Sequence, residues 1–211
     1  IAFSAVTTNN GHITLNNTQG ALSIDSVNGV AGVSAHGTGN VNLTATSPGD
    51  VGIWIKRDVS GHDVSLSGTA NGSVNGDGIK NAARALTSRG DMSLTGVASL
   101  SGMGIYAYAG SMTSAGRIEL DGTGTSNHGI NLHGNALITS TGSWAQTETA
   151  VHLKGTSNNA AVSLNGVNIQ NNSTKGTTHV EALNGRLETQ VTDFSNVIAH
   201  ASTAGQVVMS T

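Results

Sequence analysis

Six short segments of the chain alternate apolar and polar residues and end in leucine. In one of them, Val64 and Leu66 are apolar and Ser65 between them is polar. A period of two is typical of β-strands that bury one face. No stretch of eleven or more residues places its apolar residues at helical spacing, so the pattern predicts an all-β protein. The segments end at Leu15, Leu43, Leu66, Leu94, Leu120 and Leu164.

A longer repeat organises these segments. Three nine-residue stretches, LTSRGDMSL, MTSAGRIEL and ITSTGSWAQ, align without gaps and begin at evenly spaced positions, Leu86, Met112 and Ile138. A second block opens with a small residue followed by an apolar one, as in GIKNA and GIYAY, and AVHLK is a weaker copy. Its apolar residues recur at nearly even intervals, of which only the last is clearly shorter. They are Ile53, Ile79, Ile105, Ile130 and Val151.

One repeat of about 25 residues cannot bury its apolar face alone. Stacked repeats can, because each strand then pairs with its equivalent one coil away. The sequence therefore predicts a right-handed parallel β-helix with three short strands per coil, about 25 residues per coil and about eight coils. The right-handed form is chosen because it suits three-strand coils of irregular length. We assign residues 1–175 to the repeats, and residues 176–211, which carry more charge, to a terminal coil or cap of the same domain.

Glycine and proline usage agrees with such a fold. The chain has 29 glycines, which are expected where it turns sharply or packs close to the next coil. It has one proline, as expected when strands need every backbone N–H for pairing.

One repeat contains Arg89-Gly90-Asp91, a tripeptide that some cell-surface receptors recognise. Gly90 aligns with Gly116 and Gly142, which makes it the glycine of the turn before the third strand. Its two neighbours vary between the repeats, as turn residues do. The tripeptide is therefore either an incidental feature of a tight turn or a receptor motif whose two charges are exposed.

The repeat also gathers aromatic residues on one face. If the apolar residues of the second block point inward, the residues one and three positions later point outward. Trp54, Tyr106 and Tyr108 then share one sheet face with lysines and histidines. Such a face suits sugar rings, which stack on aromatics, although outward residues covered by a flanking loop fit the same pattern. The candidate ligand-binding residues are Trp54, Lys56, Tyr106, Tyr108, His133 and His152.

Two other features have simpler interpretations in this alignment. Trp144 aligns with the inward-facing Ile118, which predicts a core tryptophan rather than one that stacks on a ligand. Glu119 and Asp121 form a close acidic pair, but the aligned coil that follows has Ala145 at the position of Glu119. Because sugar-cleaving enzymes need clustered carboxylates, we expect no catalytic residues and no enzyme.

Metal and cofactor signals are weak. The eight histidines show no metal-ligand spacing, and there is no cysteine. The stretch NGSVNGDGI from Asn71 spaces its oxygen donors like a calcium loop, but Ala82 occupies the position of the required bidentate acid. We therefore expect no metal and no cofactor.

Charge and composition limit the classes of partner that the chain is expected to bind. Charged residues make up 10% of the chain, against roughly 25% in typical domains. The formal net charge is −3 and no basic patch is present, which argues against a nucleic-acid partner. No apolar run is long enough for a membrane helix, so we expect no membrane insertion. Ile1 in place of an initiator Met indicates a processed form or a piece of a longer chain.

The Gly-x-hydrophobic, TS-x-G and xVxLxG blocks of roughly residues 10–175 resemble the repeat region of filamentous haemagglutinin-like exoproteins. These are large bacterial surface adhesins secreted by the two-partner route. The resemblance implies a β-helix shaft and export through an outer-membrane transporter of the two-partner type. It also implies a secreted or cell-surface location and a role in virulence. The family has no catalytic residues to transfer to this chain.

We therefore expect a structural and adhesive segment of a surface adhesin, which binds a host-cell or bacterial-surface receptor or glycan. A polysaccharide-cleaving β-helix enzyme or tailspike is the alternative from another class, and three or more acids converging in a groove would favour it. A passive spacer shaft without a ligand is the third.

Overall fold

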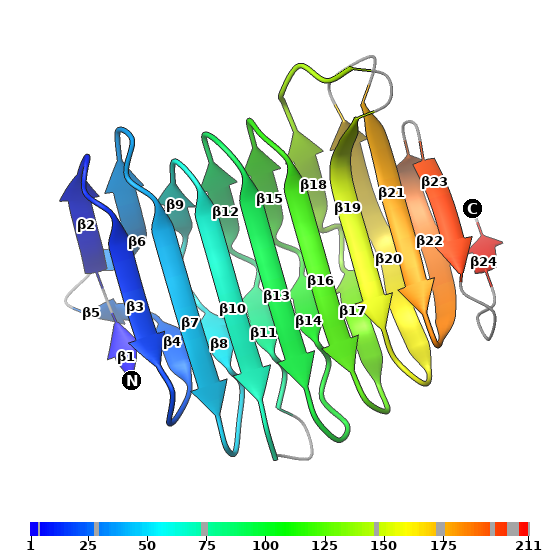
Figure 1. Ribbon diagram of the computed structural model, residues 1–211, viewed down its shortest axis with the longest axis horizontal. Coiled ribbons are helices and arrows are strands. Elements are labelled where there is room, and N and C mark those ends of the chain that lie inside the picture. The colour runs from blue at the N-terminus through cyan, green and yellow to red at the C-terminus, as the bar shows by residue number, and fades with distance from the viewer. Residues whose placement is uncertain are drawn as a thin grey trace.

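The computed structural model describes residues 1–3, 5–27, 30–72, 76–145, 148–171, 176–194, 197–201 and 207–210. The described chain forms strands and turns without any helix, and it winds into a parallel β-helix. In Figure 1 the strands of the near sheet run downward, those behind run upward, and the chain advances from left to right. This winding is right-handed, so the predicted fold class is confirmed.

Three faces run along the rod, each built from one strand per coil. The long face has strands β3 (Ile13–Asn17), β7 (Val41–Ser47), β10 (Val64–Ala70), β13 (Met92–Ala98), β16 (Ile118–Gly124), β19 (Thr149–Thr156), β21 (Thr177–Leu183) and β23 (Val197–Ala201). The aromatic face has β1 (Ala2–Phe3), β4 (Leu22–Ile24), β8 (Ile53–Ile55), β11 (Ile79–Ala82), β14 (Ile105–Tyr108), β17 (His128–His133), the first parts of β20 (Ala160–Asn171) and β22 (Arg186–Phe194), and β24 (Val207–Ser210).

The third face, which we call the hydroxyl face, carries rows of serine and threonine. It has β2 (Ala5–Asn9), β6 (Val30–His36), β9 (Val59–Gly61), β12 (Ala85–Ser88), β15 (Ser111–Ser114), β18 (Leu137–Ser140) and the second parts of β20 and β22. A short strand, β5 (Ser26–Val27), pairs antiparallel with β6. The turns number about six and average about 27 residues, on eight strand levels of the long face. The coil length expected from the sequence was therefore slightly short, and the expected number of about eight coils was too high.

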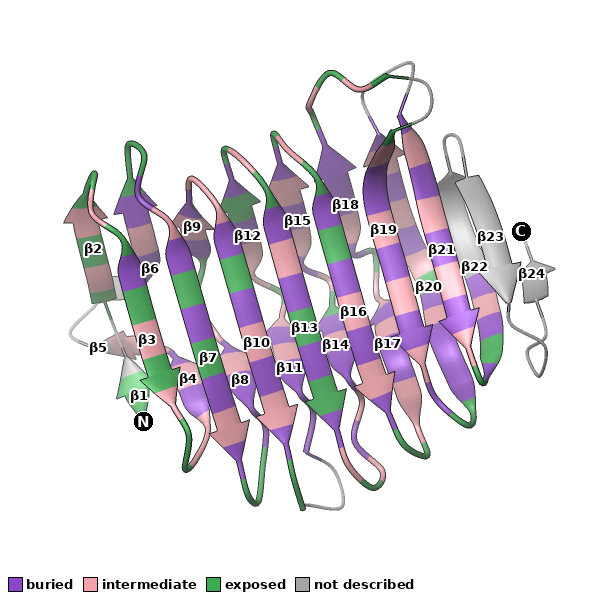
Figure 2. Cartoon of the chain, in the orientation of Figure 1, coloured by how far each residue is buried: buried purple, intermediate pink, exposed green. Residues whose placement is uncertain are grey.

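Alternation along each strand produces a narrow apolar core. Figure 2 shows buried and more exposed residues following one another along the strands of the long face. In β10, Val64 and Leu66 are 1% exposed, whereas Ser65 is exposed. Ile53 and Ile79 stack in the core of the aromatic face and are fully buried. The period-two interpretation of the sequence is confirmed.

The register differs from the predicted alignment after the fifth coil. Val151 pairs with Ile118 on the long face, and Val162 continues the row of Ile130 on the aromatic face. The similar stretches AVHL and AVSL therefore occupy each other's expected places. Ile118 and Val151 are farther apart in the sequence than Met92 and Ile118, the equivalent pair one coil earlier, because an extra segment at residues 141–148 precedes β19.

Trp144 lies in this extra segment and is not a core residue. Its side chain is only partly buried, and its indole Nε1 donates a hydrogen bond to Ser140 Oγ at 3.0 Å. The guanidinium of Arg117 lies 5.9 Å from the ring centroid. The prediction of a core tryptophan was wrong, because the insertion displaces the residue from the position that Ile118 holds one coil earlier.

Glycines at the corner between the long and aromatic faces let neighbouring coils touch. A Cβ at Gly104 would overlap backbone atoms of Gly122, Thr123 and Gly129. Gly78 holds the equivalent position one coil earlier and meets the same restriction. Only hydrogen fits at this position, which explains the glycine that opens the second sequence block.

We predict that Gly104→Val lowers the free energy of unfolding by about 3 kcal/mol or more, because the overlapped atoms belong to the paired backbone of the next coil. Gly49→Ala is the control, since nothing lies within 4 Å of a Cβ there. Denaturant unfolding followed by circular dichroism measures both. Equal stability of the two variants would contradict the close packing of coils at this corner.

Candidate functional site

Two aromatic rings and a lysine form a ladder across the aromatic face. Trp54, Lys80 and Tyr106 occupy the same position on β8, β11 and β14, and each pairs with the next. Lys80 Nζ lies 5.4 Å from the Trp54 ring centroid and 5.6 Å from that of Tyr106. An ammonium at this distance from two rings is attracted by the electrons of both. The ladder therefore fixes a positive charge between two flat apolar surfaces.

Lys56 lies at one end of this ladder. Its Nζ lies 4.2 Å from the Trp54 ring centroid and 3.0 Å from Asp25 Oδ2. The hydrogen bond from Lys56 lowers the pKa of the Asp25 carboxyl. The pair holds the lysine against the indole ring, where its ammonium can meet a bound hydroxyl.

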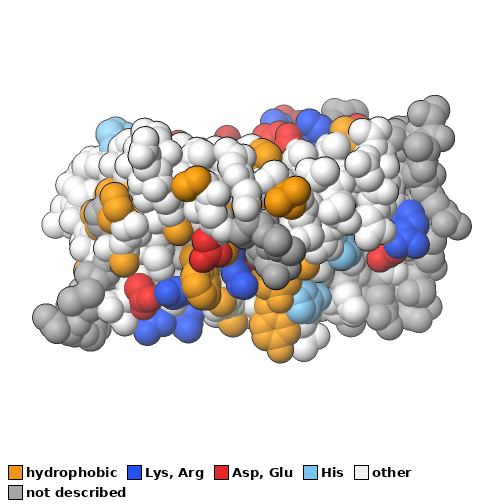
Figure 3. All heavy atoms as spheres, turned by 90° about the horizontal axis from the view of Figure 1, so that it is seen from below, with side chains coloured by type: hydrophobic (Ala, Val, Ile, Leu, Met, Phe, Trp, Pro, Cys, Tyr) orange, Lys and Arg blue, Asp and Glu red, His pale blue; other side chains and the backbone are white. Residues whose placement is uncertain are grey.

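His133 and the two tyrosines form the other end. His133 Nε2 lies 2.9 Å from the Tyr106 hydroxyl, and its ring centroid is 5.0 Å from that of Tyr108. Tyr108 is 49% exposed, which is unusual for so large a ring. Figure 3, seen from below, shows hydrophobic, basic (Lys or Arg) and histidine side chains gathered around the middle of the molecule. The structure thus brings together five of the six predicted ligand-binding residues.

A hollow of about 260 Å³ opens beside the ladder. Asp77 forms part of its wall, with a side chain only 9% exposed and Oδ1 accepting a 3.0 Å hydrogen bond from the Met103 backbone N–H. Burial raises the pKa of this carboxyl, and Lys80 Nζ is 3.9 Å from its Oδ2. This hollow was not predicted from the sequence. Its lining residues are Asp77, Lys80, Ser101, Met103, Tyr106 and Asn127.

Two buried polar atoms, one in the wall of the hollow and one on the ladder, lack partners in the described chain. Ser101 Oγ and Trp54 Nε1 are buried and make no hydrogen bond to the described part of the chain. A buried polar group without a partner costs free energy, so such groups are uncommon in folded proteins. A ligand with hydroxyl groups supplies partners of the required kind.

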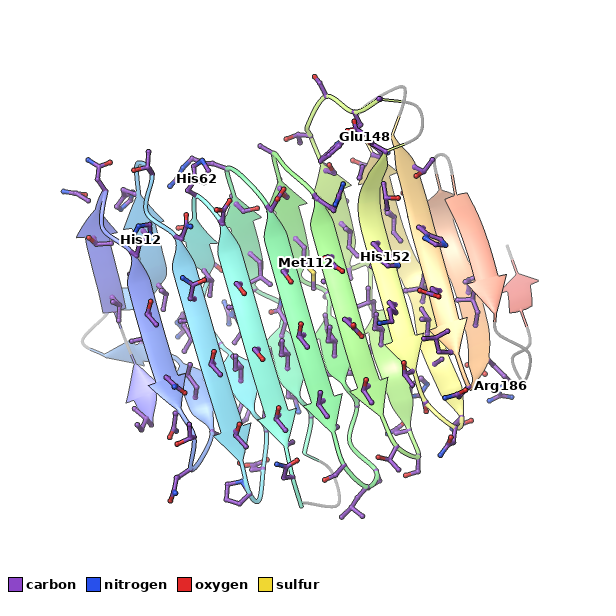
Figure 4. All side chains as sticks on the ribbon, in the orientation of Figure 1. His12, His62, Met112, Glu148, His152 and Arg186 are labelled. Carbon is purple, nitrogen blue, oxygen red and sulfur yellow. The ribbon has the colours of Figure 1, made fainter. Side chains whose placement is uncertain are left out.

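His152, the sixth predicted residue, lies elsewhere. Figure 4 shows it on β19 of the long face. Its ring stacks on that of His179 with centroids 5.1 Å apart. Its Nδ1 is 3.9 Å from Glu119 Oε1 and its Nε2 is 3.6 Å from Glu181 Oε2. The register change at residues 141–148 moved it away from the aromatic face.

The surroundings of His152 form a second cluster, which we call the acid–histidine cluster: Glu119, Asp121, His152, Lys154, His179 and Glu181. Lys154 Nζ lies 3.1 Å from Asp121 Oδ2, and this bond raises the pKa of the lysine. Glu119 pairs with His152 rather than with Ala145, the partner expected from the sequence alignment. A hollow of about 220 Å³ lies over part of the cluster.

Arg89 of the Arg-Gly-Asp tripeptide is held along the rod. The tripeptide forms the tight turn between β12 and β13. Arg89 Nη2 donates hydrogen bonds to the backbone oxygens of Ala35 and Gly37, at 2.9 and 2.7 Å. The guanidinium therefore binds backbone carbonyls two coils away.

Asp91 and Gly90 also have architectural partners. Asp91 Oδ1 accepts a 2.8 Å hydrogen bond from the Arg117 backbone N–H of the next coil. A Cβ at Gly90 would overlap Asp63 Oδ1 of the preceding coil. These contacts favour the interpretation as a tight turn, and recognition by a receptor stays a prediction.

Neither a metal-binding cluster nor a membrane-spanning helix is found among the described residues. No three His, Asp or Glu side chains of the described residues are placed to hold a metal ion. Residues 73–75 of the calcium-like stretch lie outside the described residues. The described chain contains no helix of the length and hydropathy needed to cross a membrane.

No protein-family model, curated protein or solved structure matches this chain. The fold by itself places the chain in the class of β-helix repeat proteins. The likeness to filamentous haemagglutinin-like exoproteins rests on the sequence pattern alone.

We predict that Asp91→Asn leaves the attachment of mammalian cells to protein-coated surfaces unchanged. The amide oxygen still accepts the Arg117 N–H, so the stability should change by no more than about 0.5 kcal/mol. Asp50→Asn is the matched control, because Asp50 is exposed and accepts a backbone hydrogen bond from Val51. A selective loss of attachment in folded Asp91→Asn would establish the tripeptide as a receptor motif.

Proposed function

We propose that this chain is a structural and adhesive segment of a large secreted bacterial surface adhesin, and that it binds glycans through its aromatic face. The observation that carries the proposal is the ladder of Trp54, Lys80 and Tyr106. Tyr108 on the same strand as Tyr106 and His133 on the next coil extend it.

The ladder has the chemistry that sugars require. The C–H faces of a sugar ring pack on aromatic rings, while its hydroxyls meet hydrogen-bonding side chains. Trp54 and Tyr106 are two coils apart, which corresponds to ~10 Å at the spacing of paired strands. This distance suits a short oligosaccharide lying across the coils. Lys80 between the rings supplies a donor at the middle of that path.

The rod supports this role mechanically. Its strands are tied by parallel pairing from coil to coil, so the bound ligand meets a surface that is already ordered. We further propose export through an outer-membrane transporter of the two-partner type and display at the bacterial surface, on the strength of the sequence pattern. The absence of cysteine suits a chain that crosses a membrane unfolded.

The acid–histidine cluster supports a second candidate function, cleavage of a polysaccharide. Glu119, Asp121 and Glu181 converge on one face, with His152 between two of them. Paired carboxyl groups are what glycoside hydrolysis needs for an acid and a base or nucleophile. Asp121 is bound to Lys154, which leaves Glu119 and Glu181 as the candidates for that pair.

We predict that a broad glycan panel detects binding by the chain and that Trp54→Ala/Tyr106→Ala abolishes it, because both stacking surfaces are lost. Thr87→Ala/Thr113→Ala is the matched control, since these outward residues pair on the hydroxyl face. Circular dichroism verifies that both variants are folded. Unchanged binding by the aromatic variant would contradict the proposal, and no binding by the parent chain would favour the passive spacer.

The cleavage candidate has its own test. Each polysaccharide that binds is incubated with the chain and with Glu119→Gln/Glu181→Gln, and new reducing ends are measured. We expect none, because Glu119 is largely exposed and no closed groove surrounds the pair. Reducing ends formed by the parent chain and absent with the variant would establish the enzyme instead.

A further inference from the structure

The hollow beside the aromatic ladder is assembled from three successive coils. Asp77 precedes β11, Ser101 and Met103 precede β14, and Asn127 precedes β17. Its volume of about 260 Å³ corresponds to about nine water molecules in the liquid. A space of this size accommodates a six-membered sugar ring.

Asp77 and Lys80 are spaced to share one hydroxyl group. Their charged atoms are 3.9 Å apart, which exceeds a hydrogen-bond distance and leaves the gap that a bridging oxygen fills. A hydroxyl between them would donate its hydrogen to the carboxylate and accept one from the ammonium. Ser101 also lines the hollow, and rotation of its hydroxyl, which is buried and lacks a partner in the described chain, would turn it toward an adjacent hydroxyl of the same ring.

The remaining wall and the charges restrict the sugar further. Met103 and the ring of Tyr106 give the hollow an apolar side, which suits the C–H face of a sugar ring. The carboxylate of Asp77 opposes an anionic ligand, and its charge offsets that of Lys80. The residues that line the hollow therefore suit a neutral sugar ring with adjacent hydroxyls better than a uronic acid.

We propose that this hollow is a subsite for a single neutral sugar residue with adjacent hydroxyls, at the end of a glycan chain whose other residues lie on the ladder. The proposal rests on the glycan-binding function proposed above. Asp77 and Lys80 hold one hydroxyl, Ser101 the next, and Tyr106 and Met103 contact the ring.

A buried carboxylate at this place costs stability, which separates a binding role from a structural one. Burial raises the pKa of Asp77, so the folded state holds its proton more tightly than the unfolded state does. The contribution of Asp77 to the free energy of unfolding therefore declines as pH rises above the ordinary aspartate pKa of about 3.9 and through the raised pKa of the folded state. Asp77→Asn removes the charge and retains the oxygen that accepts the Met103 N–H, so it should unfold at a higher temperature at pH 7.

The test measures affinities by calorimetry for oligosaccharides that end in mannose, galactose, fucose or galacturonate. We expect a neutral terminus to be preferred, and Asp77→Asn and Ser101→Ala each to weaken its binding by about tenfold or more. Asp77→Asn should do so while its melting temperature at pH 7 is equal to or above that of the parent. Asp91→Asn, whose side chain accepts the Arg117 backbone N–H in the turn before β13, is the control for loss of an acidic charge away from the hollow.

Two results would overturn the subsite. One is unchanged affinity of Asp77→Asn for neutral ends, and the other is a preference for galacturonate. If Trp54→Ala, which does not line the hollow, still loses binding in either case, the ladder stands and only the subsite is wrong. If no oligosaccharide binds the parent chain, the proposed function itself fails together with the subsite.

Discussion

Parallel pairing of equivalent strands, one coil on the next, is the constraint on which the rest of this molecule depends. Each strand satisfies its backbone hydrogen bonds through its neighbours, so the register of one coil sets the register of the next. Because side chains alternate, that register decides which residues enter the core and which line a face. The inward row of Ile53, Ile79 and Ile105 and the outward row of Trp54, Lys80 and Tyr106 are two results of the same pairing.

The candidate sites follow from this constraint by position. A row of outward residues becomes a continuous strip whenever successive coils carry compatible side chains, as Trp54, Lys80 and Tyr106 do. Turns that precede equivalent strands are also stacked, and this brings Asp77 close to Met103 at the edge of the strip. Asp77 thus links two coils through the Met103 N–H and also places a carboxylate in the wall of the hollow.

Much of the fold could be predicted from sequence, because the regular spacing of the Gly-Ile blocks and the period of two are both local signals. The ladder could be predicted for the same reason. His152 and Trp144 were misplaced because AVHL and AVSL are nearly alike, and pairing between distant strands decides between them. The hollow was missed although Asp77 and Met103 occupy equivalent positions before Gly-Ile, because only stacked turns show that they meet.

The most direct test of the register uses the absence of native cysteine. Asn131 and Ser163 are partners on adjacent strands of the aromatic face, so Asn131→Cys/Ser163→Cys places two thiols within disulfide distance. The regular repeat would instead put His152 beside Asn131. We predict rapid intramolecular disulfide formation under mild oxidation in Asn131→Cys/Ser163→Cys and none in Asn131→Cys/His152→Cys. The reverse result would contradict the register, and with it the residues assigned to the long face and to the aromatic face.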